Sequence, residues 1–133
     1  MDELPDFTIV GLRGCLRPGS FESIDHAADL VDAALAYARA NGLVEILADV
    51  TSLAPFPSPS VIDRFWIASR WAETACGRVR LAVVACPDHI DPARFGVTVA
   101  FNRGLHANVF TTEPEAAAWL DRFGVSGEKP LHP

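Results

Sequence analysis

Two nearly continuous apolar runs constrain the fold of this chain more than any other feature. Leu43–Val50 reads LVEILADV, and Arg78–Cys86 reads RVRLAVVAC. A strand with so little polar alternation is typically covered on both faces, as in the parallel sheets of α/β proteins. Each run follows a helical stretch that ends at a glycine, Gly42 or Gly77, where a helix commonly stops. The repeated order predicts parallel strands connected by helices.

The remaining segments extend this alternation. Further strands are expected over Phe7–Leu16 and His106–Thr111, and helices over Ser23–Asn41, from Ser58 or Ser60 to Cys76, over Ala93–Arg103, and from Thr112 to Gly124. Ala93–Arg103 is ambiguous because its β-branched residues favour a strand, but the Asp91-Pro92 start favours a helix. The sequence predicts an α/β fold of β-α-β-α-β-α-β-α order. Its single sheet has four or five strands, mainly parallel and mixed at the edge, within one domain over residues 1–124 and with a flexible tail at 125–133.

Charge and cysteine content exclude several classes of protein. The net charge of -6 over 133 residues argues against binding to nucleic acid or to an anionic membrane surface. Three well-separated cysteines, Cys15, Cys76 and Cys86, form no disulfide framework and indicate a reducing compartment. Met1–Asp6 carries three acidic residues and no apolar run, so we expect no signal peptide. No segment is long enough for membrane insertion, and we expect a cytoplasmic protein.

The Pro- and Ser-rich segment Thr51–Ser60 is the predicted site region. In an open α/β sheet, ligands gather where the strands reach their carboxyl ends. The candidate ligand-binding residues lie in or beside this region: Asp49, Thr51, Ser52, Phe56, Ser58, Ser60, Cys86 and His89. Asp49, Thr51 and Ser52 suit a polar floor for a small ligand. The plainer and favoured interpretation is that Asp49 accepts backbone N–H groups and shapes the loop.

Two further groups of residues have a functional and a structural interpretation. Ser58 and Ser60 could be phosphorylated at a helix start, although helix capping explains both. Cys86 and His89 could form an activated thiol, although a buried cysteine beside a surface histidine is the favoured interpretation. Cys-x-x-His alone lacks further zinc ligands, and no nucleotide-binding or hydrolase motif is present. We therefore expect no cofactor, no metal and no enzymatic activity.

The helix before Gly77 carries more large apolar residues than packing on one sheet requires. Its predicted core stripe consists of Val61, Phe65, Ala68, Ala72 and Cys76. Its flanks carry the candidate interface residues Trp66, Ile67, Arg70 and Trp71. Tryptophan is enriched at protein interfaces, so these flanks favour a homodimer or another partner protein, or else contact with a small apolar ligand.

Four segments of the chain resemble the SpoIIAA-like family of small bacterial proteins, which is related to STAS domains and, in fold, to Sec14-type lipid-binding domains. They are LADVTSL at 47–53, RLAVVA at 80–85, RFG at 94–96 and NVFTTEPEAAAWL at 108–120. The resemblance implies a small α/β domain that acts by binding, often self-associated and without a cofactor. It departs from STAS anti-anti-sigma factors, whose phosphorylated serine lies in an Asp-Ser-Ser/Thr-Gly motif. Here the region reads APFPSPSVID, which puts kinase regulation in question.

Three hypotheses follow for the function. The first is a non-catalytic binding or regulatory domain that acts through protein–protein association. The second is a carrier of a small apolar or lipid-like ligand under the Thr51–Ser60 loop. The third is an enzyme that uses Cys86 and His89, with or without Asp49.

Overall fold

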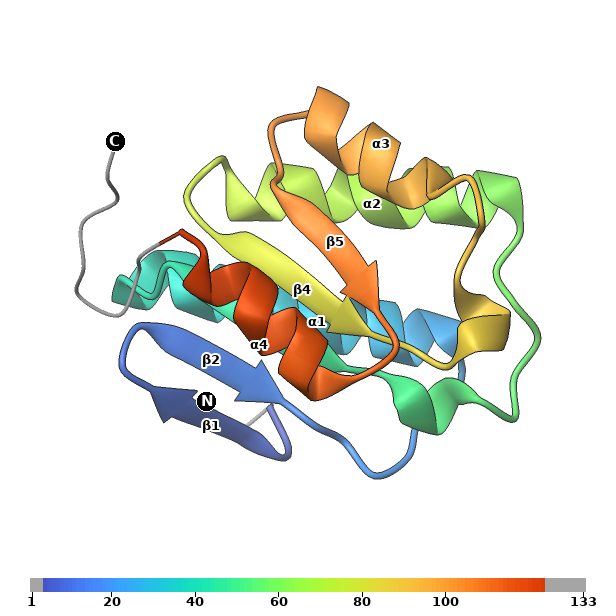
Figure 1. Cartoon of the computed structure of the whole chain (residues 1–133), viewed down its shortest axis with the longest axis horizontal. Coiled ribbons are helices and arrows are strands. Elements are labelled where there is room, and N and C mark those ends of the chain that lie inside the picture. The colour runs from blue at the N-terminus through green and yellow to red at the C-terminus, as the bar shows by residue number, and fades with distance from the viewer. Residues whose placement is uncertain (1–3, 124–133) are drawn as a thin grey trace.

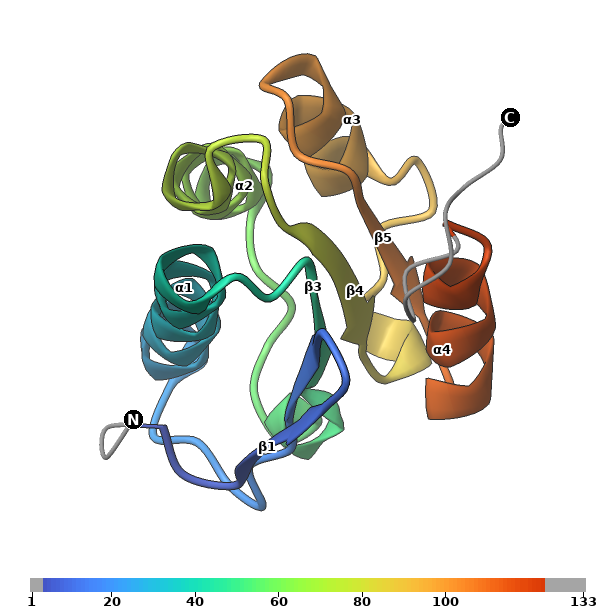
Figure 2. The same cartoon turned by 90° about the vertical axis from the view of Figure 1, so that its left-hand side faces the viewer.

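The computed structural model describes residues 4–123. One five-stranded sheet has helices on both faces. Figures 1 and 2 show α1 and α2 together on one face, α4 on the opposite face, and α3 beyond the outer strand β5. The α/β class is therefore confirmed.

The sheet is parallel apart from one edge pair. Its strands run in the order β1 (Phe7–Val10), β2 (Arg13–Leu16), β3 (Glu45–Asp49), β4 (Arg80–Val84) and β5 (Ala107–Phe110). The helices are α1 (Ile24–Asn41), α2 (Val61–Ala75), α3 (Phe95–Asn102) and α4 (Glu113–Asp121), with short 3₁₀ turns at Thr51–Leu53 and Pro87–His89. Only β1 and β2 pair antiparallel, as the predicted mixed edge requires.

The predicted single strand Phe7–Leu16 is wrong in detail, because the segment folds into a hairpin. Gly11 has φ 61° in the two-residue turn between β1 and β2. Glycine at the first position of such a turn is a hairpin signal. Gly14 allows close packing: a Cβ there would lie 2.5 Å from Phe7 Cζ. The observed order is therefore ββαβαβαβα.

The predicted helix starts are largely confirmed. Ser23, Ser60 and Thr112 are N-caps, and their side chains accept hydrogen bonds from backbone N–H groups three residues later. The ambiguous segment 93–103 forms α3. Its N-cap is Arg94 rather than Asp91, but Asp91 Oδ2 accepts the Phe95 N–H at 2.7 Å. The predicted end of the last helix at Gly124 and the predicted tail at 125–133 lie outside the described residues.

The buried stripe of α2 differs from the prediction. Ala68, Ala72 and Ala75 are its buried residues, whereas the side chains of Val61 and Cys76 are exposed. Small side chains therefore face the core from α2. Val61 is the first residue of the helix and Cys76 is its C-cap, so both lie at the ends of α2.

A buried carboxylate connects the amino-terminal ends of three parallel strands. Arg13, Glu45 and Arg80 are register partners on β2, β3 and β4. Glu45 is 1% exposed, and its carboxylate lies 2.7 Å from Arg13 Nε and 3.5 Å from Arg80 Nη2. Arg13 also contacts Asp121 on α4 at 2.6 Å. This ion cluster connects three neighbouring strands at their amino-terminal ends, and Arg13 also connects them to α4.

None of the helices within residues 4–123 combines the length and apolar character needed to cross a membrane.

Candidate functional site

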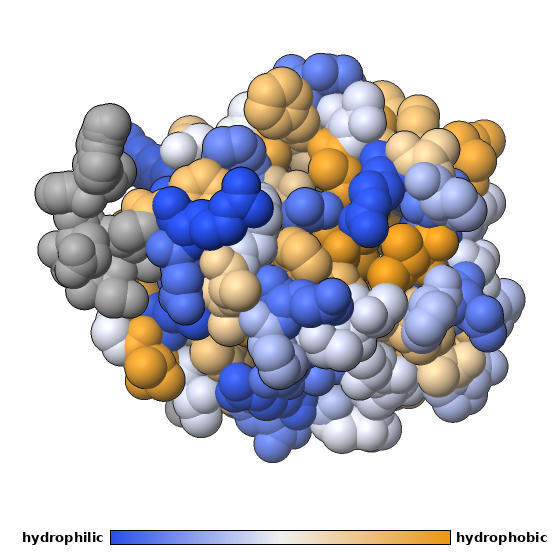
Figure 3. Space-filling view, in the orientation of Figure 1, coloured by the Kyte–Doolittle hydropathy of each residue, from blue (hydrophilic) through white to orange (hydrophobic). Residues whose placement is uncertain are grey.

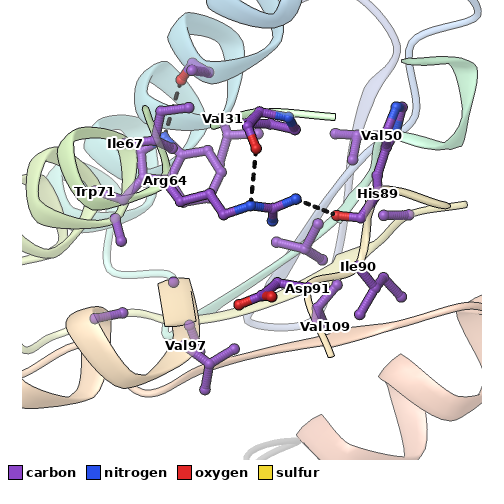
Figure 4. A pocket seen from close by; sticks show the side chains of 18 of the residues that line it. Val31, Val50, Arg64, Ile67, Trp71, His89, Ile90, Asp91, Val97 and Val109 are labelled. Atoms are coloured by element: carbon purple, nitrogen blue, oxygen red, sulfur yellow. Dashed lines mark hydrogen bonds between the residues drawn. The ribbon is translucent and has the colours of Figure 1, made fainter. Parts of the chain in front are cut away.

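An apolar pocket lies between α1, α2 and α3 and one face of the sheet. Its cavity volume is about 170 Å³. The floor is formed by Leu81, Val83 and Ala85 of β4 and its continuation, together with Ala107 and Val109 of β5. Figure 3 shows apolar side chains around a hollow beside β5, and Figure 4 shows the side chains that converge on it.

The pocket exists because small residues line it from every side. Its alanines and its glycine come from three helices and two strands or their continuations: Ala27, Ala28, Ala68, Ala85, Gly96, Ala100 and Ala107. A Cβ added at Gly96 would meet no atom within 4 Å. Protein interiors are normally close-packed, and an unfilled apolar space loses dispersion contacts. Space of this size is therefore a reason to consider a ligand.

Five of the described residues that line this apolar space are polar: Arg64, His89, Asp91, Arg94 and Asn108 of β5. Arg64 belongs to the first turn of α2, and Arg94 precedes α3. His89 and Asp91 come from the loop after β4. Pockets that combine apolar walls with a few polar groups are typical of small-molecule sites.

Arg64 connects the Pro- and Ser-rich segment Thr51–Ser60 to the rim of this pocket. Its Nε donates to the Pro59 carbonyl at 3.2 Å, and its Nη2 donates to Ser58 Oγ at 2.6 Å and to the His89 carbonyl at 3.1 Å. All three acceptors are neutral. Figure 4 shows the guanidinium extending into the pocket toward His89, with the Asp91 carboxylate facing the same space.

Cys86, His89 and Phe56 form a linked set. The Cys86 sulfur lies 3.3 Å from His89 Nδ1, and His89 Nε2 lies 2.7 Å from the Phe56 carbonyl oxygen. Because a carbonyl only accepts hydrogen bonds, Nε2 carries a proton. In the neutral ring Nδ1 is then the acceptor for the thiol. The favoured interpretation of a surface histidine is wrong, because His89 is 9% exposed and contacts Cys86.

The predicted polar floor does not belong to the pocket. Asp49 Oδ1 accepts from the Thr51 N–H at 3.0 Å and from Thr51 Oγ1 at 2.6 Å, which is the loop-shaping role that we favoured. Ser52 Oγ donates to the Pro18 carbonyl at 2.9 Å. Ser60 caps α2. Of the eight candidate ligand-binding residues, only His89 lines the cavity.

Asp49 faces the α4 side of the sheet, where it meets Glu113. Partial burial raises the pKa of Asp49, but hydrogen bonds with Glu113 and Thr51 and the nearby Arg17 charge outweigh this and lower it overall. The hydrogen bond with Asp49, followed by partial burial, raises the pKa of Glu113 above its ordinary 4.5. Arg17 Nε donates to both Glu113 oxygens at 3.0 Å. This cluster connects the start of α4 to the end of β3.

The four candidate interface residues divide into two pairs. Ile67 and Trp71 line the pocket, and Trp71 Nε1 donates to the Ala28 carbonyl at 3.1 Å. Trp66 is 64% exposed. Arg70 is also exposed and pairs with Asp29 and Asp32 of α1. The excess of large apolar residues on α2 therefore serves the pocket in part and the surface in part.

Carboxyl ends of neighbouring strands meet beside the pocket, as predicted. The Val50 N–H donates to the Val84 carbonyl at 2.8 Å, and Asp49 is the register partner of Val84. Sequence reasoning missed Arg64, Arg94 and Asp91 as rim residues. A usable signal was the accumulation of alanines on α1, α2 and the strand ends. Residues 4–123 contain no cluster of His, Cys, Asp or Glu side chains that could hold a metal ion.

Comparison with protein-family models, curated proteins and solved structures finds no match to this chain. The resemblance to SpoIIAA-like proteins therefore stays a prediction.

Proposed function

We propose that this protein binds a small apolar molecule in the pocket between α1, α2, α3 and the sheet. One observation carries the proposal: an open cavity of about 170 Å³ whose floor and walls are almost wholly apolar. An engineered apolar cavity of about 150 Å³ is sufficient to bind benzene. Burial of apolar ligand surface is the favourable contribution to binding.

A neutral aromatic alcohol, 2-phenylethanol, provides the test. We expect it to shift the backbone amide NMR signals of residues that line the pocket, such as Val31, Ala68 and Ala100, and to leave α4 unchanged. Ala107→Ile adds side-chain volume inside the cavity and should abolish these shifts while preserving the fold. Ala117→Ile, the same change on the α4 side of the sheet, is the matched control.

The proposal is wrong if the pocket amides do not move, or if Ala107→Ile binds the alcohol as the unchanged protein does. Native mass spectrometry of gently purified protein adds an independent measurement. A co-purified small molecule that is lost in Ala107→Ile would identify the natural ligand.

Self-association is a second candidate function, favoured by exposed apolar side chains on α2 and α3. Val61, Ile62, Trp66 and Phe101 are each 64–68% exposed. Ile62 and Trp66 are four residues apart and therefore neighbours on one helix face. Contiguous apolar surface of this kind often marks an interface. Sedimentation velocity at high micromolar concentration should show a dimer that Trp66→Ala dissociates, whereas a monomer in both samples would exclude it.

A further inference from the structure

We infer that the pocket's ligand is a small organic anion, with an apolar body about the size of one aromatic ring and an anionic group beside Arg64 and Arg94. This inference rests on the proposed function and specifies its ligand class. The anionic group is a carboxylate or a group of similar charge and size, which a guanidinium recognises through charge-assisted hydrogen bonds.

Arg64 carries a positive charge that no described carboxylate neutralises. Its guanidinium is half-buried, and each of its protein acceptors is neutral: a hydroxyl or a backbone carbonyl. No ion pair within 4 Å joins Arg64 to a carboxylate among residues 4–123. A charge beside apolar surface is costly unless it is paired. The contacts hold the guanidinium in place, and its charge is left for a ligand.

Arg94, which is exposed, also contacts neutral acceptors at the mouth of the same pocket. Its Nη1 donates to Asn108 Oδ1 at 3.1 Å and to the Val109 carbonyl at 2.8 Å, both neutral acceptors. Its backbone has φ 53°, a left-handed conformation that is unfavourable for a residue with a Cβ. Unfavourable backbone conformations are concentrated at functional sites. Both arginines therefore present fixed positive charge to one cavity.

The charge balance of the lining also favours an anion. Among residues 4–123, Asp91 is the only acidic residue that lines the pocket, and its Oδ2 already accepts the Phe95 N–H. Two arginines and one aspartate give the lining a net charge of +1 with histidine neutral, in a chain whose net charge is -6. The pocket is thus a local reversal of the protein's overall charge, which attracts anions to it.

The size of the cavity sets the size of the apolar body. About 170 Å³ is close to the volume that accepts benzene, and smaller than a long acyl chain would need. A ring or a short branched chain fits inside, and the anionic group remains at the rim.

Phenylacetate, phenylacetamide and phenethylamine test this inference, because they share a ring and differ in charge. Isothermal titration calorimetry measures each dissociation constant. We expect phenylacetate to bind about tenfold to a hundredfold more tightly than phenylacetamide, the range for one hydrogen-bonded charge. Arg64→Gln should remove most of this preference, and Arg94→Gln part of it. Arg70→Gln, on the exposed face of α2, should leave it unchanged.

Asp91→Asn is a second variant that does not depend on Arg64. Its amide oxygen can still accept the Phe95 N–H, while the lining gains one unit of positive charge. We expect severalfold tighter binding of phenylacetate and no change for phenylacetamide. Thermal unfolding of every variant checks that the fold is retained.

The possible results separate the two proposals. Equal binding of phenylacetate and phenylacetamide, or tighter binding of phenethylamine, would overturn the anion inference and leave an apolar pocket. If none of the three compounds and no 2-phenylethanol binds, the proposed function itself fails. An anion preference that survives in both Arg64→Gln and Arg94→Gln would place the anion elsewhere and also overturn the inference.

Discussion

The ion cluster around Glu45 and the apolar pocket use arginine in opposite ways. At the amino-terminal end, Arg13 and Arg80 share the buried carboxylate of Glu45. At the pocket end, Arg64 and Arg94 contact only neutral acceptors among the described residues. Packing differs in the same sense: a Cβ would clash at Gly14 and would meet nothing at Gly96. At the Glu45 cluster the arginines have a carboxylate partner and the packing is close, whereas at the pocket both arginines have neutral acceptors among the described residues and the space is open.

Glu45→Gln should have the largest effect, because it leaves two partly buried arginines without their carboxylate. We expect a loss of about 3–5 kcal/mol in the free energy of unfolding, measured by urea denaturation. Asp121→Asn removes the exposed partner of Arg13 and should cost less than about 1 kcal/mol. Similar losses in the two variants would mean that burial of Glu45 does not matter and would break the comparison.

Gly14→Ala tests the close packing at the same end. The added Cβ would lie 2.5 Å from Phe7 Cζ and 2.8 Å from Ile46 Cδ1. We expect a loss of about 1–3 kcal/mol, the usual cost of overpacking. Because the clash is with the Phe7 ring, the double variant with Phe7→Leu should lose less than the two single changes together. Simple additivity in urea denaturation would contradict this account.

Gly96→Ala is the counterpart at the pocket end and should have the opposite sign. Gly96 lies in the first turn of α3, and its Cβ would enter open space. Alanine stabilises a helix relative to glycine by restricting the unfolded chain and by its higher propensity. We expect a gain of about 0.5–1 kcal/mol in the same denaturation experiment. A loss would show that this end is packed as tightly as the other.

The smallest effect concerns pH. The pKa of Glu113 is raised in the folded protein, so its contribution to stability is complete below pH 4.5 and is lost as the pH rises through the folded value. Glu113→Gln should remove this decline and flatten the unfolding free energy above pH 4.5. Glu73→Gln, on the exposed surface of α2, should keep the wild-type slope. A steeper decline in Glu113→Gln would reverse the sign that we assign.

Local patterns in the sequence predicted most of the fold. Helix caps and buried strands depend mainly on residues that are close together in the sequence. The structure confirms the N-caps at Ser23, Ser60 and Thr112 and the buried strands β3 and β4. The N-terminal hairpin was missed because Gly11-Leu12 lacks the polar residues of a typical turn. Glycine in a two-residue connection was the available signal.

The pocket lies at the end of the sheet where the sequence predicted a site, but of the eight candidate ligand-binding residues only His89 lines it. Asp49, Thr51 and Ser52 bond within their own loop or to Pro18, since short polar side chains find local partners first. Arg64 and Arg94 reach the pocket only because α2 and α3 approach β4 and β5 in space, which no local pattern contains. The pocket itself has no sequence motif. The only signal for it is the number of small residues, mainly alanines, on the elements that surround it.

The position of α3 has a consequence for how the pocket can change in size. This helix stands beyond the outermost strand and contacts α2 and β5, whereas α1 covers β2 and β3, and α4 covers β3, β4 and β5. Replacing or lengthening the eight residues of α3 would change the volume of the pocket without changing the central strands. The paired strands around Glu45 would stay unchanged. The same sheet could therefore carry pockets of different volume.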